Sequence, residues 1–155
     1  MACMTVTGIP TSVLVATDGL PGSFGAGEVA AAICRGLAAV GQPAEAFPVV
    51  VADGGSLADA LSGYDERMRA ARAVVAAAGV LSRESLTGTV ISEVATRARQ
   101  AGVPCHAVVA ANRLEPFDQR ILDLQLILEA STLPEIELSG CRIGQRLRDE
   151  HDRGR

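Results

Sequence analysis

The chain has 155 residues, a formal net charge of −4 at pH 7, 48% hydrophobic residues and only 3% aromatic residues. This length suits a single domain, and the negative charge gives no support for general binding to nucleic acid or to an anionic membrane. Every basic side chain other than the two histidines is an arginine. The absence of lysine excludes a Schiff-base lysine, a lysine general base and a P-loop lysine.

A strand, a glycine-rich loop and a helix are predicted in succession near the start of the chain. The strand is predicted over 12–17 around the apolar run 13–16, Asp18 follows it, and residues 19–27 hold four glycines. In the helix predicted over 26–40, apolar residues recur at helical spacing. This order places backbone N–H groups and a helix N-terminus at the carboxyl edge of a parallel sheet, where anionic ligands bind.

Strands and helices alternate along the rest of the chain. Pro48 favours an edge position or a bulge for the second strand. The alternation predicts one three-layer, Rossmann-like α/β domain with a mostly parallel, doubly wound sheet of about five strands. We expect a flexible lead at 1–11, the domain at 12–150 and a tail at 151–155. The elements expected after the first helix are strand 44–51, a short helix 56–61, a charged surface segment 65–72, strand 73–78, helix 87–100, strand 105–110, a helical turn at 118–120, strand 122–128 and helix 139–150.

The cysteines and histidines give no catalytic pattern. Cys3, Cys34, Cys105 and Cys141 lack CxxC spacing, which predicts structural thiols rather than a disulfide or a metal site. His106 lies among apolar residues of a predicted strand, where a satisfied core or edge histidine is the simpler interpretation. No apolar run approaches the about 20 residues of a membrane span, and the N-terminus lacks a signal-peptide pattern. We therefore expect a cytoplasmic protein.

Three blocks of sequence resemble the bacterial glycerate kinase family, whose members phosphorylate glycerate with ATP. The blocks read VLVATDGLPGSFGAGEVAAAICRGL, PVVVADGG and ARAVVAAAGVLSRESLTGTVISEVATRARQAGVPCHAVVAA. They cover most of residues 12–111 in the order in which the family has them. The resemblance implies ATP and Mg²⁺ as cofactors. It also implies that the chain is truncated to the Rossmann-like host domain, because the second domain that family members carry as an insertion is missing.

Several charged positions of that family are replaced in this chain. Pro21 and Thr89 stand where the family has lysines, and Ser82 stands where it has an aspartate. The combination predicts a degenerate kinase-like transferase, or pseudoenzyme, with weak or no phosphorylation of glycerate and a retained small anion- or nucleotide-binding edge. Two alternatives stay open: a structural or self-association module with no ligand, and an active minimal glycerate kinase that is completed by oligomerisation. Whether the chain is an enzyme therefore stays open.

Asp18 and Asp53 are the candidate catalytic residues, because each follows a predicted strand and a carboxylate pair there can hold Mg²⁺ through water. The alternative is that each carboxylate caps its own turn or helix. Glycine loops can present N–H groups to a phosphate, or they can serve only as tight turns. Loop arginines can clamp an anion. The candidate phosphate- or substrate-binding residues are Gly22, Ser23, Gly54, Gly55, Ser85, Gly88, Arg83 and Arg113.

The expected partners follow from the same residues. A small anionic molecule or a nucleotide is the expected ligand, and a homo-oligomer is an open alternative to a monomer. No nucleic-acid partner, no membrane partner and no metal-ligating cluster is assigned.

Overall fold

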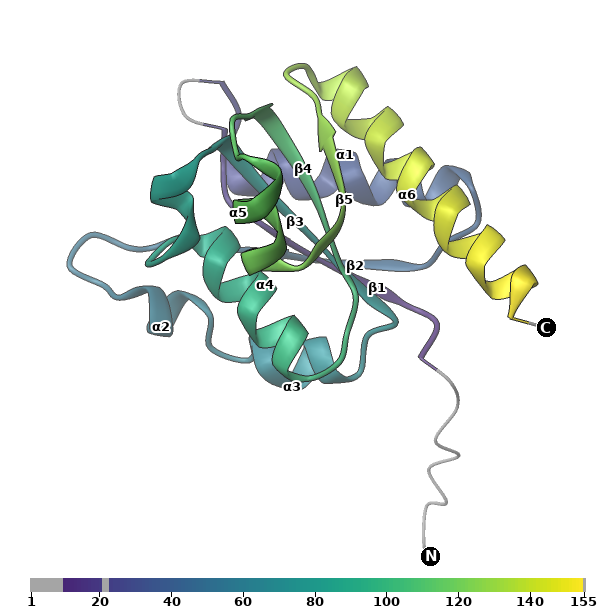
Figure 1. Cartoon of the computed structure of the whole chain (residues 1–155), viewed down its shortest axis with the longest axis horizontal. Helices are drawn as coiled ribbons and strands as arrows, with labels where there is room; N and C mark the ends of the chain where they lie inside the picture. The colour runs from purple at the N-terminus through teal and green to yellow at the C-terminus, as the bar shows by residue number, and fades with distance from the viewer. Residues whose placement is uncertain (1–9, 21–22, 155) are drawn as a thin grey trace, which may run out of the picture.

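Five parallel strands form the central layer of the molecule (Figure 1). The computed structural model describes residues 10–20 and 23–154. Neighbouring strands pair in parallel in the order β2-β1-β3-β4-β5, so all five carboxyl ends lie at one edge of the sheet. The strands are β1 (Val13–Thr17), β2 (Ala44–Pro48), β3 (Ala73–Leu81), β4 (Cys105–Asn112) and β5 (Leu124–Glu129).

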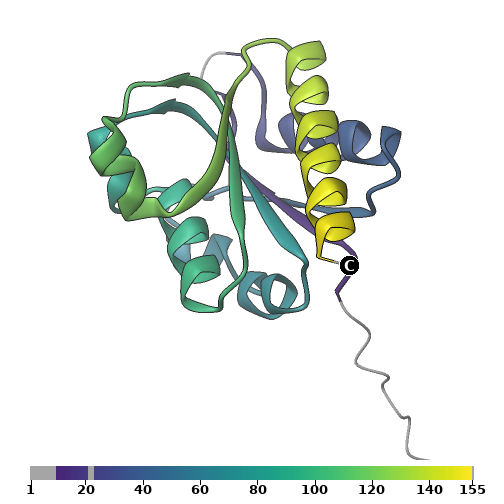
Figure 2. The same ribbon diagram turned by 45° about the vertical axis from the view of Figure 1, so that its right-hand side comes forward.

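Helices cover both faces of this sheet (Figures 1 and 2). Every residue of β1 is buried. Val13 and Val15 pack on the side of α1 and α6, whereas Leu14 and Ala16 pack on the side of α3 and α4. A strand buried on both faces must be apolar throughout rather than alternating. One face carries α1 (Ala26–Ala39) and α6 (Leu133–Arg153); the other carries α2 (Leu57–Ala60), α3 (Tyr64–Arg69), the short 3₁₀ helix η1 (Arg83–Leu86), α4 (Val90–Gln100) and α5 (Pro116–Leu122).

The predicted fold class is confirmed: the chain forms a three-layer α/β domain with a parallel, doubly wound sheet of five strands. The expected place of Pro48 is also confirmed, because Pro48 ends β2, which is an edge strand. The flexible lead predicted at residues 1–11 stays a prediction, because residues 1–9, Cys3 among them, lie outside the described residues.

Several element boundaries differ from those predicted. Strand β3 continues past residue 78 because Val80 and Leu81 still pair with β4. The segment 65–72, expected only to cover the surface, contains helix α3, whose Met68 is buried. The last helix, expected over 139–150, begins where Thr132 accepts a hydrogen bond from the Glu135 N–H and continues through residues 151–153, which were expected to be tail.

Helices α1 and α6 pack with their backbones in direct contact. A Cβ atom at Gly36 of α1 would overlap the carbonyl oxygen of Glu137, and one at Gly140 of α6 would lie 2.5 Å from the carbonyl oxygen of Ile33. Both positions are buried. Only glycine permits this approach, so the two residues determine how closely α6 lies on α1.

The substitution Gly36→Ala tests this contact. We expect it to lower the free energy of unfolding by about 2 kcal/mol or more, because the added methyl group forces the two helices apart. Gly27→Ala in the same helix is the matched control: no atom of the described residues lies within 4 Å of a Cβ built there, so we expect no loss of stability. Urea denaturation of both variants measures the difference, and equal stability of Gly36→Ala and wild type would contradict the assigned contact.

Candidate functional site

The connections after β1 and β3 leave the carboxyl edge of the sheet toward opposite faces. The chain passes from β1 to α1 on one face, and from β3 through η1 to α4 on the other. Strands β1 and β3 are neighbours in the sheet. In open α/β sheets, ligands bind in the crevice that such a reversal opens outside the carboxyl ends of the strands. This edge is therefore the candidate site.

The loop between β1 and α1 turns tightly before the helix begins. The Leu20 N–H donates to the carbonyl oxygen of Phe24 at 2.8 Å, and the Phe24 N–H donates back to Leu20 at 3.1 Å. A Cβ at Gly19 would lie 2.9 Å from the same Phe24 oxygen, so glycine permits the turn. The buried Thr17 hydroxyl donates to the Ala26 carbonyl oxygen at 2.8 Å and ties the strand end to the first turn of α1.

The N-terminus of α1 has no side-chain cap. Gly25 is its N-cap residue and makes no side-chain hydrogen bond to the helix. The first N–H groups of a helix have no partner within the helix and carry a partial positive charge. No described atom lies within 4 Å of a Cβ built at Gly25 or Gly27, so there is open space beside these amides. The arrangement can accept an anion.

The two candidate catalytic carboxylates lie on the loops after β1 and β2, at the same edge of the sheet. Asp18 accepts a hydrogen bond from the Gly19 N–H through Oδ1 at 2.8 Å, which is the capping role considered as the alternative. Asp53 is exposed in a turn that the Gly55 N–H closes on the carbonyl oxygen of Ala52 at 2.8 Å, with Gly54 at φ +76°. Their catalytic assignment stays a prediction.

The remaining candidate residues divide between structural and exposed positions. Ser85 is buried, and its Oγ donates to the Val80 carbonyl oxygen at 3.2 Å and accepts from the Ser82 N–H at 3.0 Å. It therefore holds the turn after β3. Gly88, at φ +71°, precedes the N-cap of α4. Three candidates with side chains are exposed: Ser23 after β1, Arg83 at the start of η1 and Arg113 after β4. Gly54, Gly55 and Gly88 are exposed as well, and Gly22 lies outside the described residues.

Sequence reasoning missed apolar side chains that are exposed beyond the ends of the strands. Val80 is 46% exposed at the end of β3, and Phe117 is 75% exposed in the first turn of α5. Val80 was expected in a loop because β3 was predicted to end at residue 78. Phe117 was placed in the preceding loop, although Pro116 beside it is the residue type that often occupies the first position of a helix.

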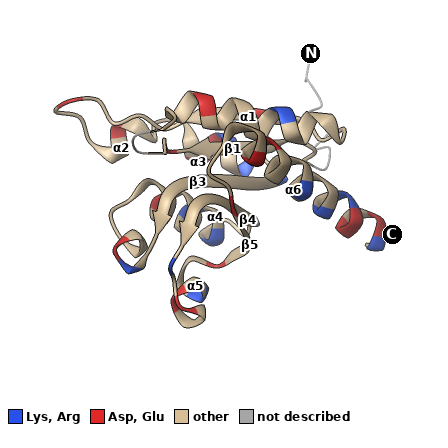
Figure 3. Ribbon diagram, turned by 90° about the horizontal axis from the view of Figure 1, so that it is seen from above, with Lys and Arg blue, Asp and Glu red and all other residues tan. Residues whose placement is uncertain are grey.

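Acidic residues gather around this edge because the helices begin there. Carboxylates occupy the first turn of α1, α2, α5 and α6, and Figure 3 shows several of these red segments from above. They stabilise the positive ends of the helices. A ligand phosphate at this edge therefore meets surrounding negative charge, and the groups available to hold it are the backbone amides and the exposed Arg83 and Arg113.

His106 is buried, as predicted, but it is not satisfied. Only 2% of its surface is exposed, and neither ring nitrogen has a hydrogen-bond partner among the described residues. The strand alternation turns its ring toward α6. Burial, followed by the nearby Arg146 charge, lowers its pKa to about 4 against the opposing effect of Glu150. A neutral, enclosed imidazole is a packing residue and has no access to the candidate site.

Several solved structures have a fold similar to that of this chain. The first is a diflavin flavoprotein A3 from Nostoc sp., with a TM-score of 0.55, 15% identity, and coverage of 94% of this chain and 99% of that one. A flavodoxin-like domain from Synechococcus sp. has a TM-score of 0.53, 19% identity and coverage of 88% and 99%. A flavodoxin from the domain Archaea has a TM-score of 0.51 and 12% identity, with coverage of 88% of this chain and 99% of that one. No protein-family description and no curated protein matches the chain.

These comparisons give the chain a flavodoxin-like fold and correct the resemblance to glycerate kinases. The structural neighbours are flavodoxin-like domains, so the predicted kinase-like transferase or pseudoenzyme is wrong. Its two alternatives, the ligand-free self-association module and the minimal kinase, gain no support either. The expected cofactors, ATP and Mg²⁺, rested on the resemblance and are corrected with it. In the part of the chain that the structure describes, no helix is long and apolar enough to cross a membrane.

The burial of His106 predicts a pH-dependent stability. Its pKa is about 4 in the folded chain against 6.5 as the ordinary value, so the unfolded chain binds the proton more readily between these two pH values. The stabilisation is complete above pH 6.5 and declines as the pH falls through this window, by about 3 kcal/mol in all. We expect His106→Leu to remove this component from urea unfolding curves measured between pH 4 and 7.5.

The exposed His151 provides the matched control for that measurement. His151→Gln should keep the wild-type dependence on pH. A wild-type curve that parallels that of His106→Leu across the whole range would show that the imidazole is not buried in the neutral form.

Proposed function

We propose that this chain binds flavin mononucleotide at the carboxyl edge around β1 and β3 and acts as an electron-transfer domain. The observation that carries the proposal is the uncapped N-terminus of α1, which opens at the point where the strand connections reverse. The names of the structural neighbours, a diflavin flavoprotein and a flavodoxin, support the choice of a flavin. A bound flavin supplies reversible one- and two-electron transfer.

The phosphate end of the flavin fits the first turn of α1. The N–H groups of Ala26, Gly27 and Glu28 belong to the part of the helix that lacks internal acceptors, and Ser23 adds an exposed hydroxyl on the loop before it. Gly25 and Gly27 leave room for the phosphate oxygens. Backbone amides and a hydroxyl are sufficient donors for a phosphate without a lysine.

The ring system of the flavin fits two exposed apolar residues, one at the end of β3 and one in the first turn of α5. Val80 lies at the end of β3, and Phe117 lies in the first turn of α5, which follows β4. Strands β3 and β4 both extend beyond the end of β1. An aromatic and an aliphatic side chain offer the flat apolar surface on which a planar ring packs and from which water is excluded. A flavin ring that packs against these two side chains would cover apolar surface that is otherwise exposed to water.

The expected location and partners belong to this proposal. A cytoplasmic location, a nucleotide as the small anionic ligand, and no nucleic-acid or membrane partner are all compatible with a flavin-binding electron carrier. A homo-oligomer is not required, because every residue of the proposed site comes from one chain.

The substitution Gly25→Asp separates binding from folding. Gly25 has φ −73° and ψ 162°, which any residue can adopt, and aspartate is a preferred N-cap. Its carboxylate would accept hydrogen bonds from the first-turn amides and repel a phosphate. We expect the melting temperature to stay equal or rise while affinity for flavin mononucleotide falls at least about tenfold. Quenching of flavin fluorescence measures the affinity.

Two comparisons make this experiment specific. Gly25→Asn has nearly the same shape without the charge, so its loss of affinity should be smaller. Riboflavin lacks the phosphate and should bind wild type and Gly25→Asp alike. If neither flavin binds wild type saturably, or if Gly25→Asp weakens both flavins equally, the proposed site is wrong.

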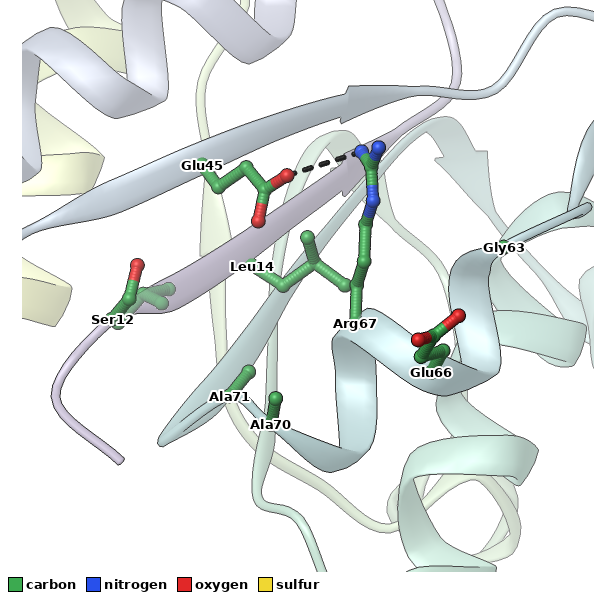
Figure 4. Close-up of a pocket in the computed structure, with 9 residues that line it drawn as sticks. Ser12, Leu14, Glu45, Gly63, Glu66, Arg67, Ala70 and Ala71 are labelled. Atoms are coloured by element: carbon green, nitrogen blue, oxygen red, sulfur yellow. Dashed lines mark ion pairs between the residues drawn. The ribbon is translucent and has the colours of Figure 1, made fainter. Parts of the chain in front are cut away.

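Glu28 offers a test in the opposite direction. It lies in the first turn of α1 and places a negative charge beside the proposed phosphate. We expect Glu28→Gln to raise the affinity for flavin mononucleotide about two- to fivefold, from the size of charge effects at a helix end, and to leave riboflavin unchanged. Glu66→Gln on α3, labelled in Figure 4, makes the same charge change at a distant cavity and should alter neither affinity.

A further inference from the structure

A cavity that we call the amino-edge cavity lies at the opposite, amino edge of the sheet. Its volume is about 330 Å³, and it lies between the end of α1, the segment before β2, the residue before β3 and the last turns of α6. Figures 1 and 2 show the C-terminal turns of α6 beside the connection from α1 to β2. The basic side chains in its lining are Arg72, Arg148 and His151, and the acidic one is Asp152.

Arg72 is held rigidly in this cavity by neutral groups. Its guanidinium donates to Gln42 Oε1 at 2.8 Å and to the carbonyl oxygen of Leu147 in α6. Gln42 is 6% exposed, and its Nε2 donates to the carbonyl oxygens of Thr11 at 2.6 Å and Pro43 at 2.9 Å. The amide is therefore oriented with its oxygen toward Arg72, so the guanidinium is fixed before any ligand arrives.

Arg148 brings a second guanidinium to the same cavity from α6. It donates to the carbonyl oxygen of Val40 at the end of α1. One such bond uses one of the five N–H groups of a guanidinium, so capping α1 leaves most of its donors available. The two arginines come from distant parts of the chain, and they line the same cavity because α6 packs along α1.

Among the described residues, neither arginine has a carboxylate partner. Five ion pairs form among the described residues, and they involve Arg35, Arg67, Arg97 and Arg146. In the part of the chain that the structure describes, no carboxylate oxygen lies within 4.0 Å of a guanidinium nitrogen of Arg72 or Arg148. Arg72 is half-buried and Arg148 is exposed, and the lining holds two guanidinium charges against the single carboxylate of Asp152. A half-buried charge such as that of Arg72 is costly without a counter-ion.

The larger cavity in Figure 4 shows the contrast. It has a volume of about 440 Å³ and also contains an arginine, Arg67. There the guanidinium lies 3.1 Å from a carboxylate oxygen of Glu45 and 5.4 Å from the centre of the Phe47 ring. Its charge is already matched, so that cavity does not call for an anion.

We propose that the amino-edge cavity binds a small phosphate-bearing dianion between Arg72 and Arg148. Its volume suits a small molecule, and the planar donor forks of guanidinium groups match the oxygens of a phosphate. This site is separate from the proposed flavin site, which lies at the carboxyl edge. The inference therefore goes beyond the proposed function and does not rest on it.

Titration of the full chain with inorganic phosphate at constant ionic strength tests the proposal. Broadening of the ³¹P resonance and the rise in melting temperature report binding. We expect saturable binding to wild type and a loss of at least about tenfold in affinity for Arg148→Met, the size expected for a charge-assisted hydrogen bond. Arg142→Met removes the same charge from an exposed position of α6 outside the cavity lining and should bind phosphate as wild type does.

Two further variants keep every outcome decisive. Arg148→Lys retains the charge but not the fork, so its loss should lie between those of wild type and Arg148→Met, provided that circular dichroism shows all variants folded. Gly25→Asp blocks the flavin site and should leave phosphate binding at the amino edge intact. Phosphate affinity that is unchanged in Arg148→Met, absent in wild type, or lost in Gly25→Asp alone overturns the inference.

The flavin titrations separate the two proposals. Arg148→Met should bind flavin mononucleotide like wild type. Failure of flavin binding together with phosphate binding that depends on Arg148 would remove the proposed function and leave the amino-edge site standing; the reverse result would remove only the amino-edge site.

Discussion

The contact between α1 and α6 through Gly36 and Gly140 is the constraint on which both proposed sites depend. Because these glycines bring the two backbones together, α1 is held with its N-terminus at the carboxyl edge and its last residues against the end of α6. The first end presents the uncapped amides that follow Gly25. At the other end, the carbonyl oxygen of Val40 accepts a hydrogen bond from Arg148. One helix therefore contributes to the two edges of the sheet with opposite chemistry.

The electrostatics of the two edges follow from the direction of the helices. In a parallel α/β fold every crossover helix starts at the carboxyl edge, where carboxylates stabilise its positive end. The amino edge receives the negative ends, and there Arg148 donates to the carbonyl oxygen of Val40, the C-cap residue of α1. Exposed ion pairs such as Arg146–Glu150 contribute little. The informative charges are those of Arg72, which is half-buried, and of Arg148, which is exposed, because both have neutral partners.

The resemblance to glycerate kinases misled because its blocks encode backbone geometry. A buried strand, an acidic turn, a glycine loop and a helix recur wherever a parallel strand is followed by a crossover helix. In the structure Asp18 bonds to the N–H of Gly19, Gly19 permits the turn against Phe24, and Ser85 closes the turn after β3. These residues are accounted for by local hydrogen bonds, so their order along the chain specifies a fold and leaves the ligand open.

From the sequence alone, local pattern determined the α/β class, a mostly parallel sheet and the glycine loop at the start of α1, because each depends on neighbours a few residues apart. Pro48 favoured an edge position or a bulge, and the structure shows the edge position. Tertiary structure decided the rest. Val80 belongs to β3 because it pairs with β4. The ring nitrogens of His106 are buried without a hydrogen-bond partner among the described residues, on the side of the sheet that α6 covers. Arg72 and Arg148 share a cavity because α6 returns to the end of α1. Contacts between residues so far apart in the chain leave no periodic signal in the sequence.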